Sequence, residues 1–462
     1  MISTSKIVNI DAFRSEIMDN ERRLFIYVPR HYEQEPNKSY PVLYMHAGQR
    51  SFAPAKPGTS SWNAHLAADR LIEAGWMEEI IIVAIAHLRP QEQNEFYHFK
   101  VPQEELHRTR CAGLDYERFI VEELKPYIDQ TYRTRPEPAY TGLMGSSGAG
   151  LCTYHIGFRH PDVFGHLAIL SPYFVRAGFD PSSRTSLAEE HLLEPYSDNP
   201  PLRMWIDIGE AEGLFLPRHA REIVDHHLAN GFVPNEQLGY YLSPDSAHEE
   251  QDWSERVHMP MLFMFGQKSD PVSLKLLGRT RVGMEGMQVR LNPIVQYANG
   301  LALTDTCAVF HSSHPEVAKV DPDGTVQAFQ VGKTEIIYRH GELQVKKMLE
   351  VIPELTPTVR LDFEVEVPED TPSDARIFAG HGMELSESED GTFRGSFVVP
   401  RDSAYHFRFT RGFRKFEVDA DGQEIPNRFI RADEDQKLIY RIEGWSGMRD
   451  NPLLPEANPF AG

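Results

Sequence analysis

The chain has 462 residues, a formal net charge of −21 at pH 7 and 41% hydrophobic residues. This length exceeds the roughly 250–300 residues at which a single core stops growing, so we expect two or three domains. The acidic balance argues against nucleic acid or an anionic membrane as a partner, because both need a basic face. No apolar run approaches the roughly 20 residues that span a bilayer, and the charged N-terminal residues lack the apolar segment of a signal peptide.

Cysteine usage favours a reducing compartment. Cys111, Cys152 and Cys307 are odd in number and widely separated, so they fit neither a disulfide framework nor a Cys-x-x-Cys metal motif. We expect a cytoplasmic protein, or a secreted one if a leader has been removed. We expect no metal or other cofactor, since no His-Glu-x-x-His or comparable ligand spacing occurs.

The first 270 residues alternate short apolar runs with helical patterns. Continuous apolar runs are typical of parallel strands that are covered on both faces. Such runs occupy residues 41–45, 80–86, 140–144, 167–170 and 203–208. Helical spacing appears in 115–132 and again in 216–232, where Pro217 and Gly231 are suitable start and stop signals. The pattern predicts an α/β sandwich with right-handed crossovers.

After about residue 280 the helical periodicity disappears and short strand-like runs separated by turn residues take over. This pattern is typical of all-β domains with hairpins. Prolines in 351–359 predict a linker. We therefore expect small β domains at 281–353 and 358–446, followed by a loosely held tail at 447–462.

Residues 140–150, YTGLMGSSGAG, lead from a predicted strand into a predicted helix and contain Ser146 and Ser147. In a nucleophile elbow, the residues two before and two after the serine must be small. For Ser146 the first of these positions is methionine, whereas for Ser147 the two are Gly145 and Ala149. The pattern predicts Ser147 as a nucleophile. The alternative is a tight turn whose serines only cap the helix.

A nucleophilic serine needs a histidine base and a carboxylate that orients the base. In α/β-hydrolases the chain order is serine, then Asp or Glu, then histidine. Glu210 and Glu212 follow the predicted strand 203–208, and His248 lies in a loop after the last strand-like run. Asp207 is expected inside the strand and is less free to reach the base. The residues themselves leave Glu210 and Glu212 open as the acid.

The oxyanion hole of such a site combines the N–H after the nucleophile with one from a loop after an early strand. These positions correspond to Gly148 and Gln49. Arg50, in the same loop, is a candidate contact for an anionic substrate, although surface arginines are common. Phe96 and Tyr97 are candidates for an aromatic acyl pocket, with local packing as the alternative.

Six segments in chain order resemble the Putative esterase family of α/β-hydrolases, which includes enterochelin esterases, feruloyl esterases, S-formylglutathione hydrolases and mycolyltransferases. The segments are YPVLYMHAGQ, EELKPYIDQTYRT, GSSGAG, RHPDVFG, LSPYF and HEEQDWSERV. The resemblance covers about residues 20–266. It implies an α/β-hydrolase fold with Ser147 as nucleophile, Glu212 as acid and His248 as base. Trp253, in the helix expected after His248, is a further candidate substrate contact.

The chain departs from the family in two short motifs. The family commonly has HDGQ where this chain has HAGQ, and SMGG where it has SGAG. The first difference falls in the oxyanion loop, where it could change substrate contacts. Neither difference removes a catalytic group.

Two further resemblances concern the C-terminal part. Residues 285–352 resemble a bacterial immunoglobulin-like domain of group 2, and residues 358–446 resemble a starch- or glycogen-binding-type β-sandwich. Sugar platforms need exposed aromatic rings, and Trp445 is the only tryptophan in the second segment. We therefore favour a structural or docking role, including assistance to a homodimer. Residues 1–270 are expected to fold and act alone.

The sequence thus predicts a serine carboxylic-ester hydrolase that forms an acyl-enzyme intermediate. Its partner would be a small-molecule or glycan-linked ester. An acyltransferase with the same three residues is an alternative, in which an alcohol replaces water. A non-catalytic, multidomain binding protein on a hydrolase scaffold is another.

Overall fold

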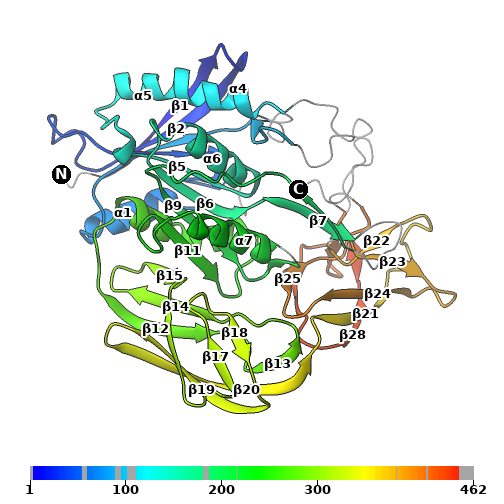
Figure 1. Cartoon of the computed structure of the whole chain (residues 1–462). Coiled ribbons are helices and arrows are strands. Elements are labelled where there is room, and N and C mark those ends of the chain that lie inside the picture. Colours follow the sequence, from blue (N-terminus) through cyan, green and yellow to red (C-terminus); the bar gives the residue numbers. More distant parts are fainter. Residues whose placement is uncertain are drawn as a thin grey trace.

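The computed structural model shows an α/β part followed by a part made of β-strands (Figure 1). It describes residues 4–54, 60–88, 95–100, 111–179, 187–214, 216–380, 382–412 and 415–446. The predicted tail at 447–462 therefore lies outside the described residues. Within the described ranges, no helix is long and apolar enough to cross a membrane.

The α/β part is organised around one large sheet, in which the described strands follow the order β1-β2-β4-β3-β5-β6-β9-β11. The β1–β2 and β2–β4 pairs are antiparallel, and the other neighbours are parallel. The strands are β1 (Lys6–Ser15), β2 (Asn20–Val28), β3 (Val42–Met45), β4 (Ile81–Ile85), β5 (Thr141–Ser146), β6 (His166–Pro172), β9 (Arg203–Gly209) and β11 (Leu238–Ser243). The five strands predicted from apolar runs are confirmed, whereas the β1–β2 hairpin was not predicted.

Helices cover both faces of this sheet, which explains the continuous apolar runs. Val42 and Tyr44 of β3 belong to one buried cluster, and Leu43 and Met45 belong to the opposite one, because successive side chains alternate between faces. The first cluster includes α4 to α7, and the second includes α1 and α9. The helical segments are α1 (Ala64–Glu73), α4 (Gly113–Arg118), a π-helical turn (Phe119–Leu124), α5 (Lys125–Thr131), α6 (Ser147–Arg159), α7 (Leu216–Ala229), α8 (Glu250–Arg256) and α9 (His258–Phe265).

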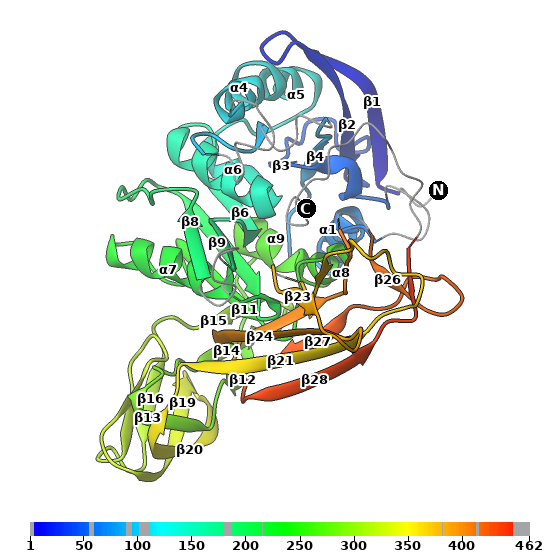
Figure 2. The same cartoon turned by 90° about the vertical axis from the view of Figure 1, so that its right-hand side faces the viewer.

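From residue 271 onward, the described residues form strands and no helix. Figure 2 shows them beneath the α/β part, with the yellow-green strands at lower left and the orange and red strands at lower right. The first group is β12 (Pro271–Leu277), β13 (Arg281–Gly286), β14 (Asn292–Tyr297), β15 (Ala302–Thr304), β16 (Val309–Ser312), β17 (Ala318–Val320), β18 (Val326–Ala328), β19 (Gly332–His340) and β20 (Leu343–Leu355). It has its own buried cluster, which includes Val282, Ile336 and Tyr338.

The second group is built on a sheet with the order β22-β23-β24-β21-β28. Its buried cluster includes Leu361, Phe363 and Tyr405. The group is β21 (Thr358–Glu366), β22 (Ile377–Phe378), β23 (Glu384–Glu387), β24 (Phe393–Pro400), β25 (Ala404–Phe407), β26 (Glu417–Val418), β27 (Arg428–Arg431), β28 (Gln436–Arg441) and β29 (Gly444–Trp445). The resemblances of 285–352 and 358–446 to particular domain families stay predictions.

The junction between the two groups is shorter than the predicted linker at 351–359. Strand β20 continues to Leu355 and β21 begins at Thr358. Pro353 therefore lies within a strand. Prolines are tolerated at sheet positions whose N–H is not needed for pairing, and Pro357 lies in the junction itself, so the break falls within the predicted linker.

The first C-terminal group packs on the edge of the large sheet. Thr304 accepts a hydrogen bond at Oγ1 from the Leu242 N–H over 3.0 Å, and Asn292 Nδ2 donates to the Leu242 carbonyl over 3.1 Å. Trp205 and Phe263 form a buried cluster with Ile294 and its neighbours. Edge strand β11 is therefore covered rather than left open for pairing.

The second C-terminal group pairs directly with the α/β part. The short strand β10 (Glu212–Gly213) is antiparallel to β25, with Glu212 opposite Tyr405 and Gly213 opposite Ala404. Strand β25 also pairs with β27, so β10, β25 and β27 form one three-stranded sheet. This contact joins residues 1–270 to the C-terminal part, and the expectation that they fold and act alone stays a prediction.

Candidate active site

The turn from β5 into α6 has the geometry of a nucleophile elbow. Ser147 has φ 55°, in the left-handed region that side chains seldom occupy, whereas Ser146 is extended. A Cβ at Gly145 would lie 2.4 Å from the carbonyl oxygen of Ala149, so that position accepts only glycine. The steric argument from the sequence therefore corresponds to a real close approach of the backbone, and it singles out Ser147.

The surroundings of Ser147 come from two other segments. The Tyr173 N–H donates to the Ser147 carbonyl over 3.1 Å, which ties the elbow to the end of β6. Gly148 lies beside Tyr97, since a Cβ at position 148 would be 3.0 Å from the tyrosine hydroxyl oxygen. Gly148 is also at the N-terminal end of α6, where backbone N–H groups are free of helix partners and attract negative charge.

The loop predicted to supply the second oxyanion donor lies next to the elbow. It follows β3, whose Met45 is paired with Met144 of β5. The loop forms one turn of 3-10 helix at Gly48–Arg50. The side chain of Gln49 fixes this turn, because its amide donates to the His87 carbonyl over 2.7 Å and accepts from the His87 N–H over 3.2 Å.

An acid–base pair is formed by Glu212 and His248. His248 Nδ1 lies 2.9 Å from Glu212 Oε2. The other two candidate carboxylates are engaged elsewhere: Asp207 pairs with Arg256 over 2.9 Å, and Glu210 pairs with Arg431 over 3.2 Å. The structure therefore brings Glu212 to the histidine, in agreement with the implication of the resemblance.

The second oxygen of Glu212 is held by three donors. Oε1 accepts from the Gly209 N–H over 2.7 Å, from Ser171 Oγ over 2.5 Å and from Arg256 Nη2 over 3.1 Å. The carboxylate is buried, so these bonds replace the water that would otherwise solvate its charge. They also fix its orientation, which leaves Oε2 directed at His248.

Arg256 is shared between two buried carboxylates. Its Nε donates to Asp207, and its Nη2 donates to Glu212. Burial raises the pKa of Asp207 above its usual range, although Arg256 opposes this shift. Burial alone would lower the pKa of Arg256, but the charges of Asp207 and Glu212 raise it. The arginine therefore remains a cation that holds the acid in place.

The predicted substrate contacts lie near this site but are largely enclosed. Trp253 is 6% exposed, and its ring lies 5.0 Å from that of His248, which leaves little surface for a substrate. Phe96 and Tyr97 are each 8% exposed. Phe96 packs edge-on against Tyr116. We therefore interpret Trp253 and Phe96 as packing residues that support the site.

Arg50 is half-exposed and forms an ion pair with Glu250, two residues after His248. This pair connects the oxyanion loop to the start of α8. A paired guanidinium attracts an anionic substrate less than a free one does. The structure thus gives Arg50 a role in joining two loops.

Sequence reasoning missed Ser171, and it placed Arg256 in the helix after the histidine without giving it a contact. Ser171 is the second residue of the LSPYF segment of the resemblance and has φ 45°, so its backbone is as unusual as that of Ser147. The segment itself was a signal, because a conspicuous serine at the end of a strand next to the elbow is a candidate for the site.

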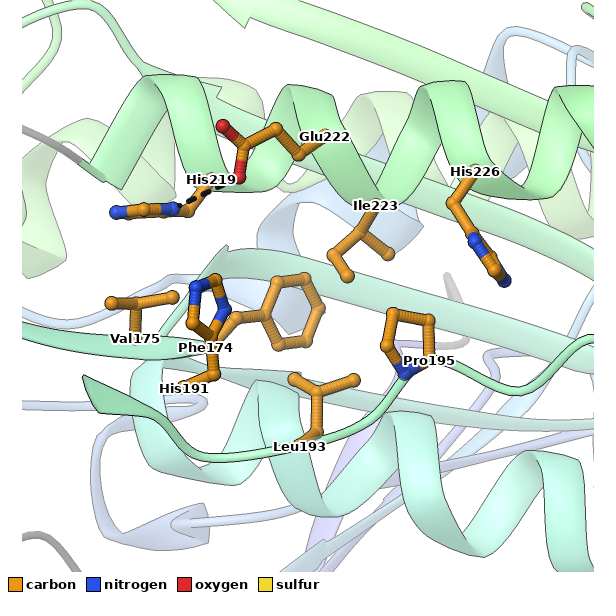
Figure 3. Close-up of a pocket in the computed structure, with 9 residues that line it drawn as sticks. All are labelled: Phe174, Val175, His191, Leu193, Pro195, His219, Glu222, Ile223 and His226. Carbon is orange, nitrogen blue, oxygen red and sulfur yellow. Dashed lines mark hydrogen bonds and ion pairs between the residues drawn. The ribbon is translucent and has the colours of Figure 1, made fainter. Parts of the chain in front are cut away.

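A cavity of about 210 Å³ lies beside α7 and does not include Ser147, Glu212 or His248 in its lining. Figure 3 shows His219 and Glu222 on the α7 side of the cavity, and His191 among apolar side chains on the opposite side. The lining residues are Phe174, Val175, His191, Leu193, Pro195, His219, Glu222, Ile223 and His226. Among the residues that the structure describes, no group of three or more His, Cys, Asp or Glu is placed to hold a metal ion.

A family model described as Putative esterase matches residues 15–260, which is more than half of the chain. The chain belongs to the Putative esterase family. The matched residues include the elbow, Glu212 and His248. The C-terminal strands of this esterase-family protein lie outside the match.

Two curated relatives match over about a third of this chain. An endo-1,4-beta-xylanase/feruloyl esterase of Xylanibacter ruminicola is 26% identical over 166 residues, or 34% of this chain and 20% of the relative. The uncharacterized protein YjcH of Bacillus subtilis is 24% identical over 161 residues, or 35% of this chain and 60% of the relative. The chain thus spans less than two thirds of the length of either relative.

Solved structures with some likeness include a ferulic acid esterase, with a TM-score of 0.43 and 20% identity over 57% of this chain and 98% of that one. The enterobactin esterase of Shigella flexneri has a TM-score of 0.43 and 15% identity over 56% of this chain and 58% of that one. The family match, rather than these likenesses, relates the chain to esterases.

Proposed function

We propose that this protein is a serine carboxylic-ester hydrolase with Ser147 as nucleophile, His248 as base and Glu212 as acid. The observation that carries the proposal is the 2.9 Å contact between His248 and Glu212, together with the strained backbone of Ser147. A serine held in such a turn, with a histidine oriented by a buried carboxylate, is the arrangement that activates a hydroxyl for attack on a carbonyl. Membership of the Putative esterase family supports it.

In this mechanism Ser147 Oγ attacks the ester carbonyl carbon while His248 Nε2 takes the hydroxyl proton. Glu212 stabilises the imidazolium that forms. The backbone N–H groups of Gly148 and Gln49 bind the negative charge on the carbonyl oxygen. The tetrahedral intermediate collapses, the alcohol leaves with the proton from His248, and the acyl group stays on Ser147.

Deacylation repeats the same steps with water. His248 removes a proton from water, the hydroxide attacks the acyl-enzyme, and the carboxylic acid product leaves as Ser147 regains its proton. Glu212 again stabilises the protonated ring. Arg256, Ser171 and the Gly209 N–H serve the reaction by fixing the orientation of Glu212.

The test compares Ser147→Ala with Ser146→Ala in the full chain. Ser147→Ala is expected to lower kcat on a p-nitrophenyl ester by a factor on the order of 10⁴–10⁶, and to abolish labelling by a fluorophosphonate probe. Ser146→Ala is the matched control and is expected to keep most of the kcat and most of the fluorophosphonate labelling. Equal losses in the two variants, or a wild-type protein that the probe does not label, would contradict the proposal.

Product analysis in the presence of acceptor alcohols separates hydrolysis from acyl transfer. Free acid as the main product supports the hydrolase, whereas a new ester as the main product would make the protein an acyltransferase. A panel of feruloyl esters, acetylated sugars and siderophore lactones identifies the acyl group that the site prefers. This panel includes the ester classes that the names of the relatives suggest.

A further inference from the structure

The strand that carries the catalytic acid is completed by the last third of the chain. Glu212 and Gly213 form β10, which pairs with Tyr405 and Ala404 of β25. Leu214, the next residue, is 6% exposed and belongs to the buried cluster of the second C-terminal group. Glu212 is therefore tied by strand pairing and by its near neighbour Leu214 to the second C-terminal group.

Arg431 joins the turn of the acid to the loop of the base. It lies on β27, opposite Ala404 of β25. Its Nη1 and Nη2 donate to the two oxygens of Glu210, each over 3.2 Å, and Nη2 also donates to Asp245 over 2.9 Å. Glu210 is two residues before the acid, and Asp245 is three residues before the base.

The two segments that Arg431 joins also touch each other directly. The Ala211 N–H donates to the Ser246 carbonyl over 2.9 Å, and the Glu210 N–H donates to the Ser243 carbonyl over 2.8 Å. A displacement of one segment therefore moves the other. A guanidinium that binds both carboxylates restricts the relative position of Glu212 and His248.

A second contact is made with the residue that follows the base in the chain. The Asn427 side chain donates a hydrogen bond to the Glu249 carboxylate. Glu249 directly follows His248 and precedes α8. The segment 427–431 thus contacts residues on both sides of the histidine.

We propose that the second C-terminal group is part of the active-site scaffold, and that Arg431 is a positioning residue that sets the geometry of the Glu212–His248 pair. This inference rests on the proposed function. An isolated, half-exposed ion pair contributes little to stability, so the role of Arg431 is to set position. Small displacements of catalytic groups, on the order of 1 Å, lower rates by about 100-fold.

The test measures kcat, KM and melting temperature of the full chain carrying Arg431→Ala or Arg431→Lys. Arg431→Ala is expected to lower kcat by about 10- to 100-fold, with KM changed by less than about threefold. Arg431→Lys keeps the charge but not the forked geometry, so an intermediate kcat is expected. Fluorophosphonate labelling of Ser147 is expected to slow in parallel.

The matched control is Arg376→Ala. Arg376 lies in the same C-terminal group and makes a forked pair with Glu384, with both bonds at 2.8 Å, on an exposed surface. Its kcat is expected within twofold of the wild type. A kcat of Arg431→Ala within twofold as well would overturn the inference.

Glu210→Gln tests the same bridge from the other end and remains available if Arg431→Ala does not fold. If Arg431 acts through Glu210, the double variant is expected to lose no more than the worse single variant. A double variant whose fold-loss in kcat equals the product of the two single losses would overturn the inference. Activity that survives Ser147→Ala would instead contradict the proposed function. Failure of the proposed function and failure of the inference about Arg431 are therefore distinguishable.

Discussion

Trp253 donates its indole N–H to Ser171 Oγ over 2.7 Å. The same oxygen lies 2.6 Å from Arg256 Nη2 and 2.5 Å from Glu212 Oε1. A hydroxyl has one proton and two lone pairs, so Ser171 accepts from Trp253 and Arg256 and donates to Glu212. Every hydrogen-bonding position of this buried side chain is occupied.

Ser171→Ala is expected to destabilise the fold by about 1–3 kcal/mol, because three buried groups lose a partner. It is also expected to lower kcat by about tenfold, since Glu212 loses one of its three holding bonds. Chemical denaturation and steady-state kinetics check the two effects. Ser273→Ala, which removes a single bond to Gln296 far from the site, is the control. An unchanged kcat would show that Glu212 does not depend on Ser171.

Glu212→Gln is expected to lower kcat by a factor on the order of 10⁴, because the histidine loses its stabilising charge. Asp207→Asn breaks a buried pair with Arg256 and is expected to cost about 3–5 kcal/mol of stability. Its kcat per folded molecule should fall far less. Kinetics corrected for the folded fraction distinguish the two variants, and a larger loss of kcat in Asp207→Asn would mean that the acid is misassigned.

Gly148→Ala is expected to lower kcat about tenfold, because the new methyl group would lie 3.0 Å from the Tyr97 hydroxyl and displace a residue of the proposed oxyanion hole. Tyr97→Phe removes that hydroxyl and is expected to restore part of the loss. The double-mutant cycle on kcat measures this coupling. Independent effects of the two substitutions would show that the tyrosine does not press on Gly148.

Stability is expected to fall as the pH decreases from about 6.5 to 4. Burial lowers the pKa of His227 to about 4 and that of His155 to about 3. In an unfolded chain a histidine titrates near about 6.5. The unfolded state therefore binds more protons in this window, and stability that is present above it is lost as the pH falls. Melting temperatures recorded across the window check the direction.

His227→Gln is expected to reduce this dependence by up to about 1.4 kcal/mol per pH unit, because one titrating group is removed. Glutamine can still form a hydrogen bond with Tyr154 Oη, which lies 2.9 Å from His227 Nε2. His311→Gln, on an exposed strand residue, is the control and is expected to leave the slope unchanged. Identical slopes in the two variants would assign the acid sensitivity to other groups.

The sequence carried enough information for the sheet and for much of the site. Buried parallel strands are apolar throughout, so β3 and β4 stand out, whereas edge strand β1 has mostly exposed side chains and no such signal. Ser147 could be proposed as the nucleophile because the steric demand of its turn is local.

The parts that could not be predicted depend on which strands are neighbours. Ser171 reaches Glu212 because β6 and β9 are adjacent in the sheet. The pairing of β10 with β25 could not be predicted from the sequence, since a strand of two residues has no periodicity. Arg431 is one of many charged residues in the β part, and only the pairing of β25 with β27 gives it a position next to Glu210.

The bridge between Arg431 and Glu210 joins residues that are 221 positions apart in the chain. During synthesis, Ser147, Glu212 and His248 all leave the ribosome long before Arg431 does. At 5–20 residues per second, the intervening stretch after residue 270 takes about ten to thirty seconds to translate. Under the proposed role of Arg431, nascent chains are expected to be poor catalysts until translation is nearly complete. Proteolytic removal of the C-terminal strands is likewise expected to lower the activity of a finished molecule while leaving Ser147, Glu212 and His248 in the chain.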